Sequence, residues 1–194
     1  MNTQWHALNN IPAEWIKLME RLIAVAPSAI LAGGALRDLD NGRPIKDLDV
    51  FVYAGEAHDA FDHLSKEGFV IDCTFDGSYV DAAKDIDAAY CCRKEGHLDV
   101  NVVILREPHT ISEAISRFDF GICQIALLGQ SAVATEEYLK DKADQTITMI
   151  RADCPKGFQW SMRRFERLSE KYVGWKLVVP EEIANKIDVM EQVG

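Results

Sequence analysis

The first long segment of the chain carries apolar residues at helical spacing. Five apolar side chains fall on one stripe when residues 13–25 are wound as a helix, and the segment begins directly after Pro12. They are Trp15, Leu18, Met19, Leu22 and Ile23. The pattern predicts an amphipathic helix over residues 13–25 that packs on a sheet.

Period-two alternation, apolar runs and turn residues place the other elements. We expect strands at residues 47–53, 69–73, 86–93, 98–105, 122–128 and 145–150. We expect further helices at residues 56–67, 111–117 and 155–172, and two more that begin at Thr135 and Pro180. Strands mixed with helices, joined by hairpins and crossovers, predict an α+β (mixed α/β) fold, with a small mixed sheet, helices on one face and the functional site on the other.

Paired carboxylates occupy the strand predicted over residues 47–53. Asp47 and Asp49 project from one face of this strand, and Leu48 points to the other face. Two such anions repel each other unless a cation lies between them, and Mg²⁺ prefers carboxylate oxygens and substrate phosphates. The pair therefore favours phosphoryl or nucleotidyl transfer. The alternative is that Asp47 is a turn residue and Asp49 faces solvent, since short motifs often occur by chance.

A glycine turn precedes this pair. An apolar run ends in Gly33 and Gly34, and a helix-compatible segment follows. Glycines at a strand-to-helix turn let backbone N–H groups approach an anion closely, and a helix start carries a partial positive charge. Arg37 lies within reach of the same place and can pair with a phosphate through two hydrogen bonds. The alternative is a simple tight turn in which Arg37 pairs with Asp38 or Asp40.

A third carboxylate is needed if two metal ions share the transferred phosphate. Asp99 is our choice, because residues 98–105 form the clearest strand pattern in the second half of the chain. A Glu-Gly dipeptide before this strand fits a hairpin loop. That arrangement places Asp99 next to the strand that carries Asp47 and Asp49. The rival is a second Asp-x-Asp, Asp85 and Asp87, which could supply the ligand if the strand order were different; for Asp87 a solvated face is the favoured interpretation.

Length and composition are those of one folded domain, or one domain with a small appendage: 194 residues, of which 48% are hydrophobic. A net charge of −10 argues against broad DNA binding, because such binding needs clustered Lys and Arg; a local basic patch near the C-terminal end stays open. The five cysteines lack Cys-x-x-Cys spacing and fit a reducing compartment. No segment has the pattern of a membrane span or a secretory leader, so we expect a cytoplasmic protein without a membrane partner.

Two runs resemble the signature of the polymerase-beta-type nucleotidyltransferases, and most of all the branch with bacterial poly(A) polymerases and CCA-adding tRNA nucleotidyltransferases. The first reads Gly33-Gly34-Ala35-Leu36-Arg37-Asp38, then Gly42-Arg43, then Lys46-Asp47-Leu48-Asp49. The second reads Arg117-Phe118-Asp119-Phe120-Gly121-Ile122-Cys123-Gln124-Ile125-Ala126 and is similar to that branch's R-R-D-F-T-I-N-A. Two motifs in the expected order are far more specific than either alone. With weaker similarity further along, the resemblance covers most of the chain.

The resemblance implies an architecture and a set of residue roles. Residues 1–130 would form a catalytic nucleotidyltransferase head, and residues 131–194 a short helical neck packed on it, without the C-terminal body that grips tRNA in that family. The three aspartates would hold two Mg²⁺ ions: Asp47, Asp49 and Asp99. Other residues would bind the nucleotide: Gly33, Gly34, Arg37, Arg117, Asp119 and Arg163.

The sequence departs from the family in two places. Where the nucleotide-selecting helix of the family reads E-D-x-x-R, the aligned run is Gln159-Trp160-Ser161-Met162-Arg163, which keeps only the arginine. In the second motif Phe118 replaces the usual second arginine, which leaves Arg117 and Asp119 as the matching positions. The choice of base therefore does not carry over from the resemblance.

Two functional hypotheses remain. The leading one is Mg²⁺-dependent transfer of a nucleoside monophosphate from an NTP to an acceptor hydroxyl, with release of pyrophosphate. The acceptor would be an RNA or tRNA 3′ end, a protein side chain or a small molecule. The second hypothesis is a module of the same fold that holds a nucleotide without turnover and recruits a protein partner. Retention of all three acids argues against decay, because a degenerate site gains nothing from closely spaced buried anions.

Overall fold

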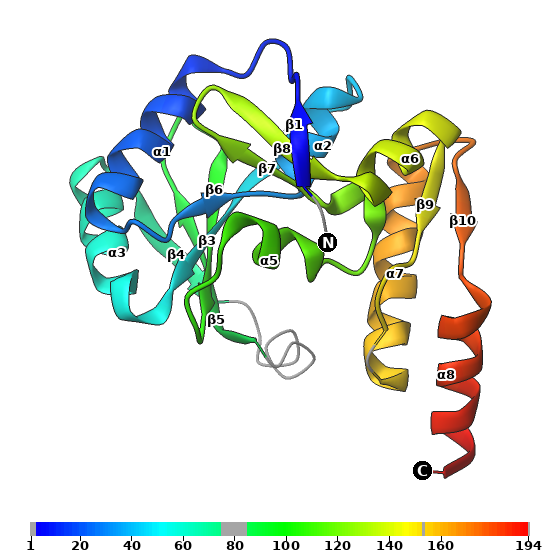
Figure 1. Ribbon diagram of the computed structural model, residues 1–194. Helices are drawn as coiled ribbons and strands as arrows, with labels where there is room; N and C mark the ends of the chain where they lie inside the picture. Colours follow the sequence, from blue (N-terminus) through cyan, green and yellow to red (C-terminus); the bar gives the residue numbers. More distant parts are fainter. Residues whose placement is uncertain (1–2, 75–84, 153, 194) are drawn as a thin grey trace.

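The computed structural model describes residues 3–74, 85–152 and 154–193, and a five-stranded mixed sheet lies at its centre (Figure 1). The strand order is β2-β3-β6-β5-β4. These strands are β2 (Ile30–Leu31), β3 (Asp47–Tyr53), β4 (Val70–Thr74), β5 (Ile86–Arg93) and β6 (Asp99–Leu105). β3 and β6 run parallel, and every other neighbouring pair in this sheet is antiparallel.

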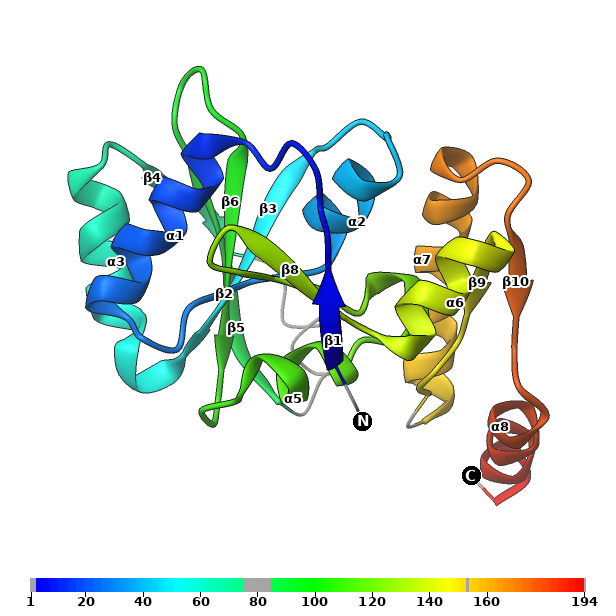
Figure 2. The ribbon, with the colours of Figure 1, turned by 45° about the horizontal axis from the view of Figure 1, so that its top comes forward.

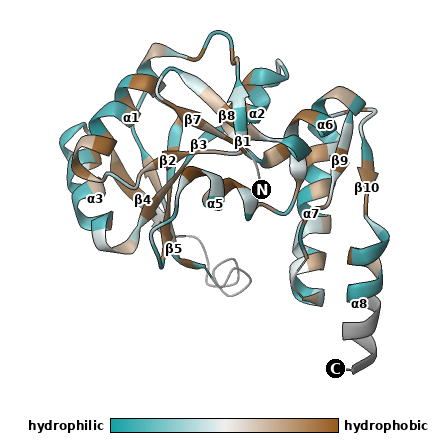
Figure 3. Ribbon diagram, in the orientation of Figure 1, coloured by the Kyte–Doolittle hydropathy of each residue, from teal (hydrophilic) through white to brown (hydrophobic). Residues whose placement is uncertain are grey.

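Two helices, α1 (Ala13–Val25) and α3 (Ala57–Lys66), cover one face of this sheet (Figure 2). Their inward side chains share one core with the even-numbered residues of β3 and β6. The residues that meet there include Trp15, Met19, Leu22, Leu64, Val50 and Val102. Figure 3 shows hydrophobic residues along the strands and mixed colouring on these helices, as expected for helices with one face on a sheet. The predicted helix over residues 13–25 is confirmed, although Ile23 is exposed rather than buried.

A second, three-stranded sheet lies beside the first, with the order β1-β8-β7 (Figure 1). Its antiparallel strands are β1 (Thr3–His6), β7 (Ile125–Leu128) and β8 (Ser131–Thr135). Two short helices, α2 (Gly34–Asp40) and α5 (Ile111–Ser116), contact β7. In sequence α2 follows the glycine turn after β2 and precedes β3, so predicted site residues lie at both of its ends.

The last part of the chain packs against both sheets on one side (Figures 1 and 2). Its elements are α6 (Glu136–Asp144), β9 (Thr146–Thr148), α7 (Pro155–Lys171), β10 (Lys176–Val178) and α8 (Glu181–Val193). β9 and β10 form a short parallel pair, and α8 contacts α7. Among the helices that the structure describes, none combines the length and apolar character needed to cross a bilayer.

The proposed division into a head and a neck at residue 130 falls in the turn between β7 and β8. Because β8 is the middle strand of the small sheet, this division separates β7 from the strand it pairs with. Tyr138, Ile147 and Leu168 of the neck are buried in the same core cluster as the large sheet. Head and neck therefore share one hydrophobic core.

Most predicted elements are confirmed. The differences are one strand that begins later than predicted and three strands that were not predicted. The strand predicted over residues 122–128 begins at Ile125, because Gly121–Cys123 forms a 3₁₀ turn. The sequence did not predict β1, β8 or β10. β8 is buried over most of its length and lacks the alternation that marks a half-exposed strand, so its pattern gives no period-two signal.

Candidate functional site

A cleft of about 540 Å³ lies on the face of the large sheet opposite α1 and α3. Strand alternation sends the odd-numbered residues of β3 and β6 to this face, as predicted. Its floor is formed by Asp49, Phe51, Ala89, Asn101, Val103 and Leu105. α7 forms a wall with residues from one side of the helix: Gly157, Trp160, Ser161, Arg164 and Arg167. The cleft therefore has an apolar floor, an acidic end on β3 and a wall rich in arginine.

The predicted carboxylates meet at neighbouring strand positions. Asp47 is the register partner of Asp99, and Asp49 is the register partner of Asn101, because β3 and β6 start level with each other. Asn101 Nδ2 donates a hydrogen bond of 2.9 Å to Asp49 Oδ1. The prediction that Asp99 lies beside the strand with the pair is confirmed. Asn101 received no role from the sequence, although strand alternation places it on the same face as Asp99.

Asp49 is held where its negative charge is disfavoured. Burial raises the pKa of its carboxyl group, and the charge of Asp47 raises it further. The hydrogen bond from Asn101 and the charges of Arg164 and Arg37 lower this pKa by less, so the net direction is upward. An anion in this condition is stabilised by any cation that binds beside it.

The oxygen donors of Asp47 and Asp49 fit a divalent cation. Both are hard ligands on one strand face, and the raised pKa of Asp49 indicates a charge that its protein neighbours do not fully compensate. Asp99 is engaged elsewhere, because its Oδ2 accepts a hydrogen bond of 3.1 Å from Arg93 Nε. Within residues 3–74, 85–152 and 154–193, no three acidic, His or Cys side chains are grouped to hold an ion. Asp99 would join the pair by exchanging Arg93 for the ion.

The rival acids lie at the opposite end of the sheet. Ile86 is the register partner of Leu105, the last residue of β6, whereas Asp99 is its first. Asp85 Oδ2 forms an ion pair of 2.6 Å with Arg117 Nη1 at the far end of the cleft. Asp87 lies beside Ile86 at this end and is exposed, in agreement with the solvated face favoured from the sequence.

Gly33 and Gly34 differ in backbone conformation and in what surrounds them. Gly33 has φ +79° and ψ −122°, a conformation that L side chains rarely adopt, and an added Cβ would lie 3.4 Å from the ring of Phe118. At Gly34 an added Cβ would lie 3.7 Å from both Asp49 Oδ2 and Arg37 Nη2. The glycine turn therefore brings the first residue of α2 directly beside the buried carboxylate of β3.

Arg37 lies near Asp49, and its guanidinium group contacts Asp38, Cys123 and Tyr172. Its Nε and Nη2 each contact Asp38 Oδ1 at 2.8 Å, and its Nη1 donates to Cys123 Sγ at 3.2 Å. Nε also lies 3.2 Å from the hydroxyl oxygen of Tyr172. The pairing of Arg37 with Asp38, which the sequence left open, is thus present.

The second motif and α7 meet at Asp119. Ser161 Oγ donates a hydrogen bond of 2.9 Å to Asp119 Oδ2, and Arg164 Nη1 forms an ion pair of 2.9 Å with Oδ1. Arg163, the predicted nucleotide-binding arginine of this helix, lies over the ring of Trp160 at 5.6 Å and does not line the cleft. The polar positions that face the cleft are shifted by one residue from the aligned motif. Helical spacing from Trp160 to Arg164 and Arg167 is the signal that could have found them.

The comparisons with known proteins give the fold. No family model matches the chain, and no curated protein sequence matches it. A tRNA nucleotidyltransferase complexed with a primer tRNA and an incoming ATP analogue has a TM-score of 0.57 and 19% identity, over 84% of this chain and 46% of its own. The complex of a CCA-adding enzyme with ATP has a TM-score of 0.62 and 16% identity, over 91% and 43%. The Thermotoga maritima CCA-adding enzyme complexed with tRNA has a TM-score of 0.59 and 16% identity, over 87% and 40%.

These structures are all more than twice as long as the part of them that this chain covers. Their identity to the chain is low, so the likeness concerns the arrangement of helices and strands. That arrangement agrees with the α+β head expected from the two sequence motifs. The chain therefore has the nucleotidyltransferase fold that it shares with part of the tRNA nucleotidyltransferases and CCA-adding enzymes.

Proposed function

We propose that this chain is a nucleotidyltransferase that moves a nucleoside monophosphate from an NTP to an acceptor hydroxyl. The acceptor oxygen forms a new bond to the α-phosphorus, the bond to the leaving pyrophosphate breaks, and the hydroxyl proton goes to solvent. The observation that carries the proposal is the placement of Asp47 and Asp49 on the cleft face of β3, in register with Asp99 and next to the Gly33-Gly34 turn.

Different residues at the cleft would bind the metal ions and the triphosphate. Asp47 and Asp49, with Asp99 once it leaves Arg93, would hold two Mg²⁺ ions, which supply charge stabilisation at the reacting phosphate and a lower pKa for the acceptor hydroxyl. The turn at Gly33 and Gly34 lets the backbone of α2 approach the triphosphate.

The walls of the cleft position the rest of the nucleotide. Trp160 offers an aromatic face to the base, and Arg117 and Arg164 bring positive charge to an otherwise acidic protein. A bound cation would also stabilise the charge of Asp49, because the neighbouring protein groups leave that charge partly uncompensated.

An RNA 3′ end is the acceptor that the structural neighbours favour, since two of them were solved with tRNA. A protein side chain remains the second acceptor class. Incubation of the chain with labelled NTPs, Mg²⁺, total RNA and total protein, followed by separation of the labelled products, distinguishes these classes.

Asp47→Asn and Asp49→Asn should each lower pyrophosphate release by at least about 100-fold, because each removes a charged ligand from the reacting phosphate. The control is Asp59→Asn, an exposed acid on α3 whose loss should leave the rate unchanged. Asp49→Asn should retain or raise the melting temperature, since it removes a disfavoured charge and keeps an oxygen for Asn101. Full transfer activity in either cleft variant, with the wild type active, contradicts the proposal.

A nucleotide-binding module without turnover is the second candidate, and one contact favours it. Asp99 is paired with Arg93 at 3.1 Å, so the third carboxylate already has a cation of the protein. Calorimetry with ATP and CTP, with and without Mg²⁺, separates the two functions when it is combined with a pyrophosphate assay. Binding without pyrophosphate release in the presence of total RNA and protein supports the module.

A further inference from the structure

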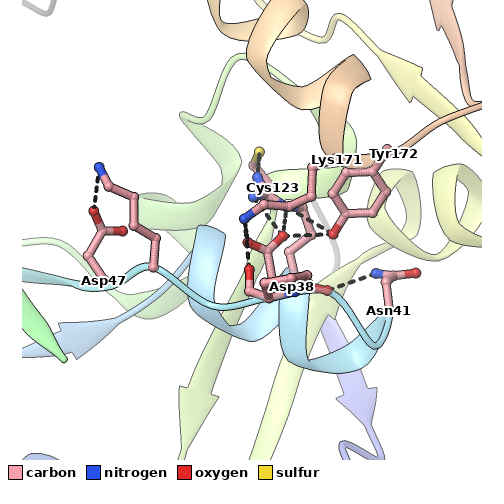
Figure 4. Close-up of polar contacts among 9 residues, drawn as sticks. Asp38, Asn41, Asp47, Cys123, Lys171 and Tyr172 are labelled. Carbon is pink, nitrogen blue, oxygen red and sulfur yellow. Dashed lines mark hydrogen bonds and ion pairs between the residues drawn. The ribbon is translucent and has the colours of Figure 1, made fainter. Parts of the chain in front are cut away.

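A buried carboxylate outside the cleft joins α2 to the end of α7 (Figure 4). Asp38 is 3% exposed, and three side chains contact it. Arg37 contacts Oδ1 at 2.8 Å, the hydroxyl of Tyr172 donates to Oδ1 at 2.8 Å, and Lys171 Nζ donates to Oδ2 at 2.5 Å. Two of these three partners come from the C-terminal end of α7, more than 130 positions away in sequence.

The same end of α7 also contacts the segment that leads into β3. Lys171 Nζ donates a second hydrogen bond, of 2.9 Å, to the carbonyl oxygen of Pro44. The guanidinium groups of Arg37 and Arg43 lie 5.4 Å and 5.5 Å from the centre of the Tyr172 ring. The end of α7 is therefore attached to α2, which follows the glycine turn, and to the segment before β3, which carries the paired carboxylates.

α7 has a second fixed point in its middle, where Ser161 and Arg164 contact Asp119. Ser161 and Lys171 are ten residues apart, which is about 15 Å along a helix. The residues that line the cleft fall on one stripe that begins at Gly157, and Lys171 continues this stripe four residues beyond Arg167. Two fixed points on one stripe determine both the tilt and the rotation of the helix that forms the cleft wall.

We propose that Asp38 is a positioning residue for nucleotide binding. Through Lys171 and Tyr172 it holds the end of α7, so that Trp160 and Arg164 face the cleft; through Arg37 it holds a cation beside Asp49. Without this latch α7 keeps its contact with Asp119 and the apolar packing of Leu168, but its C-terminal end loses its polar connection to α2 and samples orientations in which the cleft wall is displaced. The inference rests on the proposed function, because it states what sets the affinity of that site for its nucleotide.

The test variant is Lys171→Met, which removes the cation at the exposed edge of the latch and leaves Arg37, Asp38 and Tyr172 in place. The KM for the NTP should rise about tenfold, because both hydrogen bonds of the Lys171 ammonium group are lost, whereas kcat should change by less than about twofold. Lys171→Arg keeps the charge and should restore the KM to within about twofold. The matched control is Lys140→Met, an exposed cation on α6, which should leave both constants unchanged.

Hydrogen exchange of the nucleotide-free protein gives a readout that does not depend on activity. In Lys171→Met the amides of residues 164–172 should exchange about tenfold faster, while those of β3 and β6 keep the wild-type rate. Unchanged exchange at the end of α7, or an unchanged KM in an active protein, overturns the proposal. Faster exchange throughout the sheet also overturns it, because Lys171 would then contribute only to overall stability. If the wild type neither binds nor transfers nucleotides, the proposed function fails, and exchange at the end of α7 alone decides whether the latch positions the helix.

Discussion

Two single residues beside the cleft occupy an unusual conformation or an unfavourable environment. Gly33 adopts a backbone conformation reserved for glycine directly under the ring of Phe118. Asp49 keeps a carboxylate where burial and a second carboxylate oppose its charge. Gly33 adopts this conformation without strain because it lacks a Cβ, whereas the charge of Asp49 is disfavoured in the folded state. The raised pKa of Asp49 is the residue-scale observation that supports the proposed cation site.

Gly33→Ala tests how strongly the turn before α2 requires a glycine. It should destabilise the protein by about 2–3 kcal/mol, because φ +79° with ψ −122° is a strained backbone conformation for alanine, whereas the 3.4 Å contact of the new Cβ with Phe118 is an ordinary one. Gly42→Ala is the comparison variant, since Gly42 has a positive φ of 61° and nothing within 4 Å of an added Cβ. It should cost about 1 kcal/mol. Urea unfolding of both variants measures the difference, and equal losses would show that the backbone at Gly33 tolerates alanine as well as the backbone at Gly42 does.

At the scale of elements, single acids join segments that are far apart in sequence. Asp40, the last residue of α2, accepts hydrogen bonds from His6 of β1 and from Tyr138 of α6, each at 2.7 Å. Lys142 of α6 adds an ion pair of 2.7 Å. Burial raises the pKa of Asp40, but these partners lower it by more, so the pKa lies below its ordinary value.

The lowered pKa makes the contribution of Asp40 depend on pH. Because the folded-state pKa is depressed, the stabilisation is present above the ordinary pKa of about 4 and is lost as the pH falls through the depressed value. Asp40→Asn should therefore lower the free energy of unfolding by about 1.5–3 kcal/mol at pH 7. Between pH 4 and pH 2 the two proteins should converge. Urea unfolding across this range checks the sign, and a difference that persists undiminished at pH 2 would contradict it.

At the scale of the whole molecule, the predicted head and neck share one interior. Tyr172 and Ile187 near the C-terminal end belong to the same buried cluster as Trp15 and Val50 of the central sheet. A chain with one continuous core unfolds as one unit. The boundary suggested by the resemblance therefore does not separate two hydrophobic cores.

Cooperative unfolding can be followed from both ends. Two variants each keep one of the four tryptophans, Trp15 under the sheet or Trp175 beside Tyr172, with the other three replaced by phenylalanine. Their fluorescence transitions in urea should have the same midpoint relative to far-UV circular dichroism of the same variant. A transition at Trp175 that precedes the loss of circular dichroism would show that the last helices unfold independently.

Local patterns determined the elements and the face on which each candidate residue lies. The amphipathic helix over residues 13–25 has the predicted bounds, and alternation in β3 and β6 placed Asp47, Asp49 and Asp99 on one side of the sheet. These features follow from periodicities of 3.6 and 2 residues, which depend only on neighbours in sequence. The two motifs, read in order, also indicated the nucleotidyltransferase fold.

Only the tertiary structure decided which groups meet. From the sequence, the partner of Arg37 could be a phosphate or Asp38. In the structure Arg37 pairs with Asp38, and it also contacts Tyr172 and Cys123, which come from distant segments. The one-residue shift from Arg163 to Arg164 depends on how α7 is rotated against the sheet, which the contact at Asp119 fixes. Periodicity sets the faces of an element by itself, but the rotation and partner of each face arise from packing between segments that are far apart in the sequence, such as Arg37 with Cys123 and Tyr172, 86 and 135 positions away.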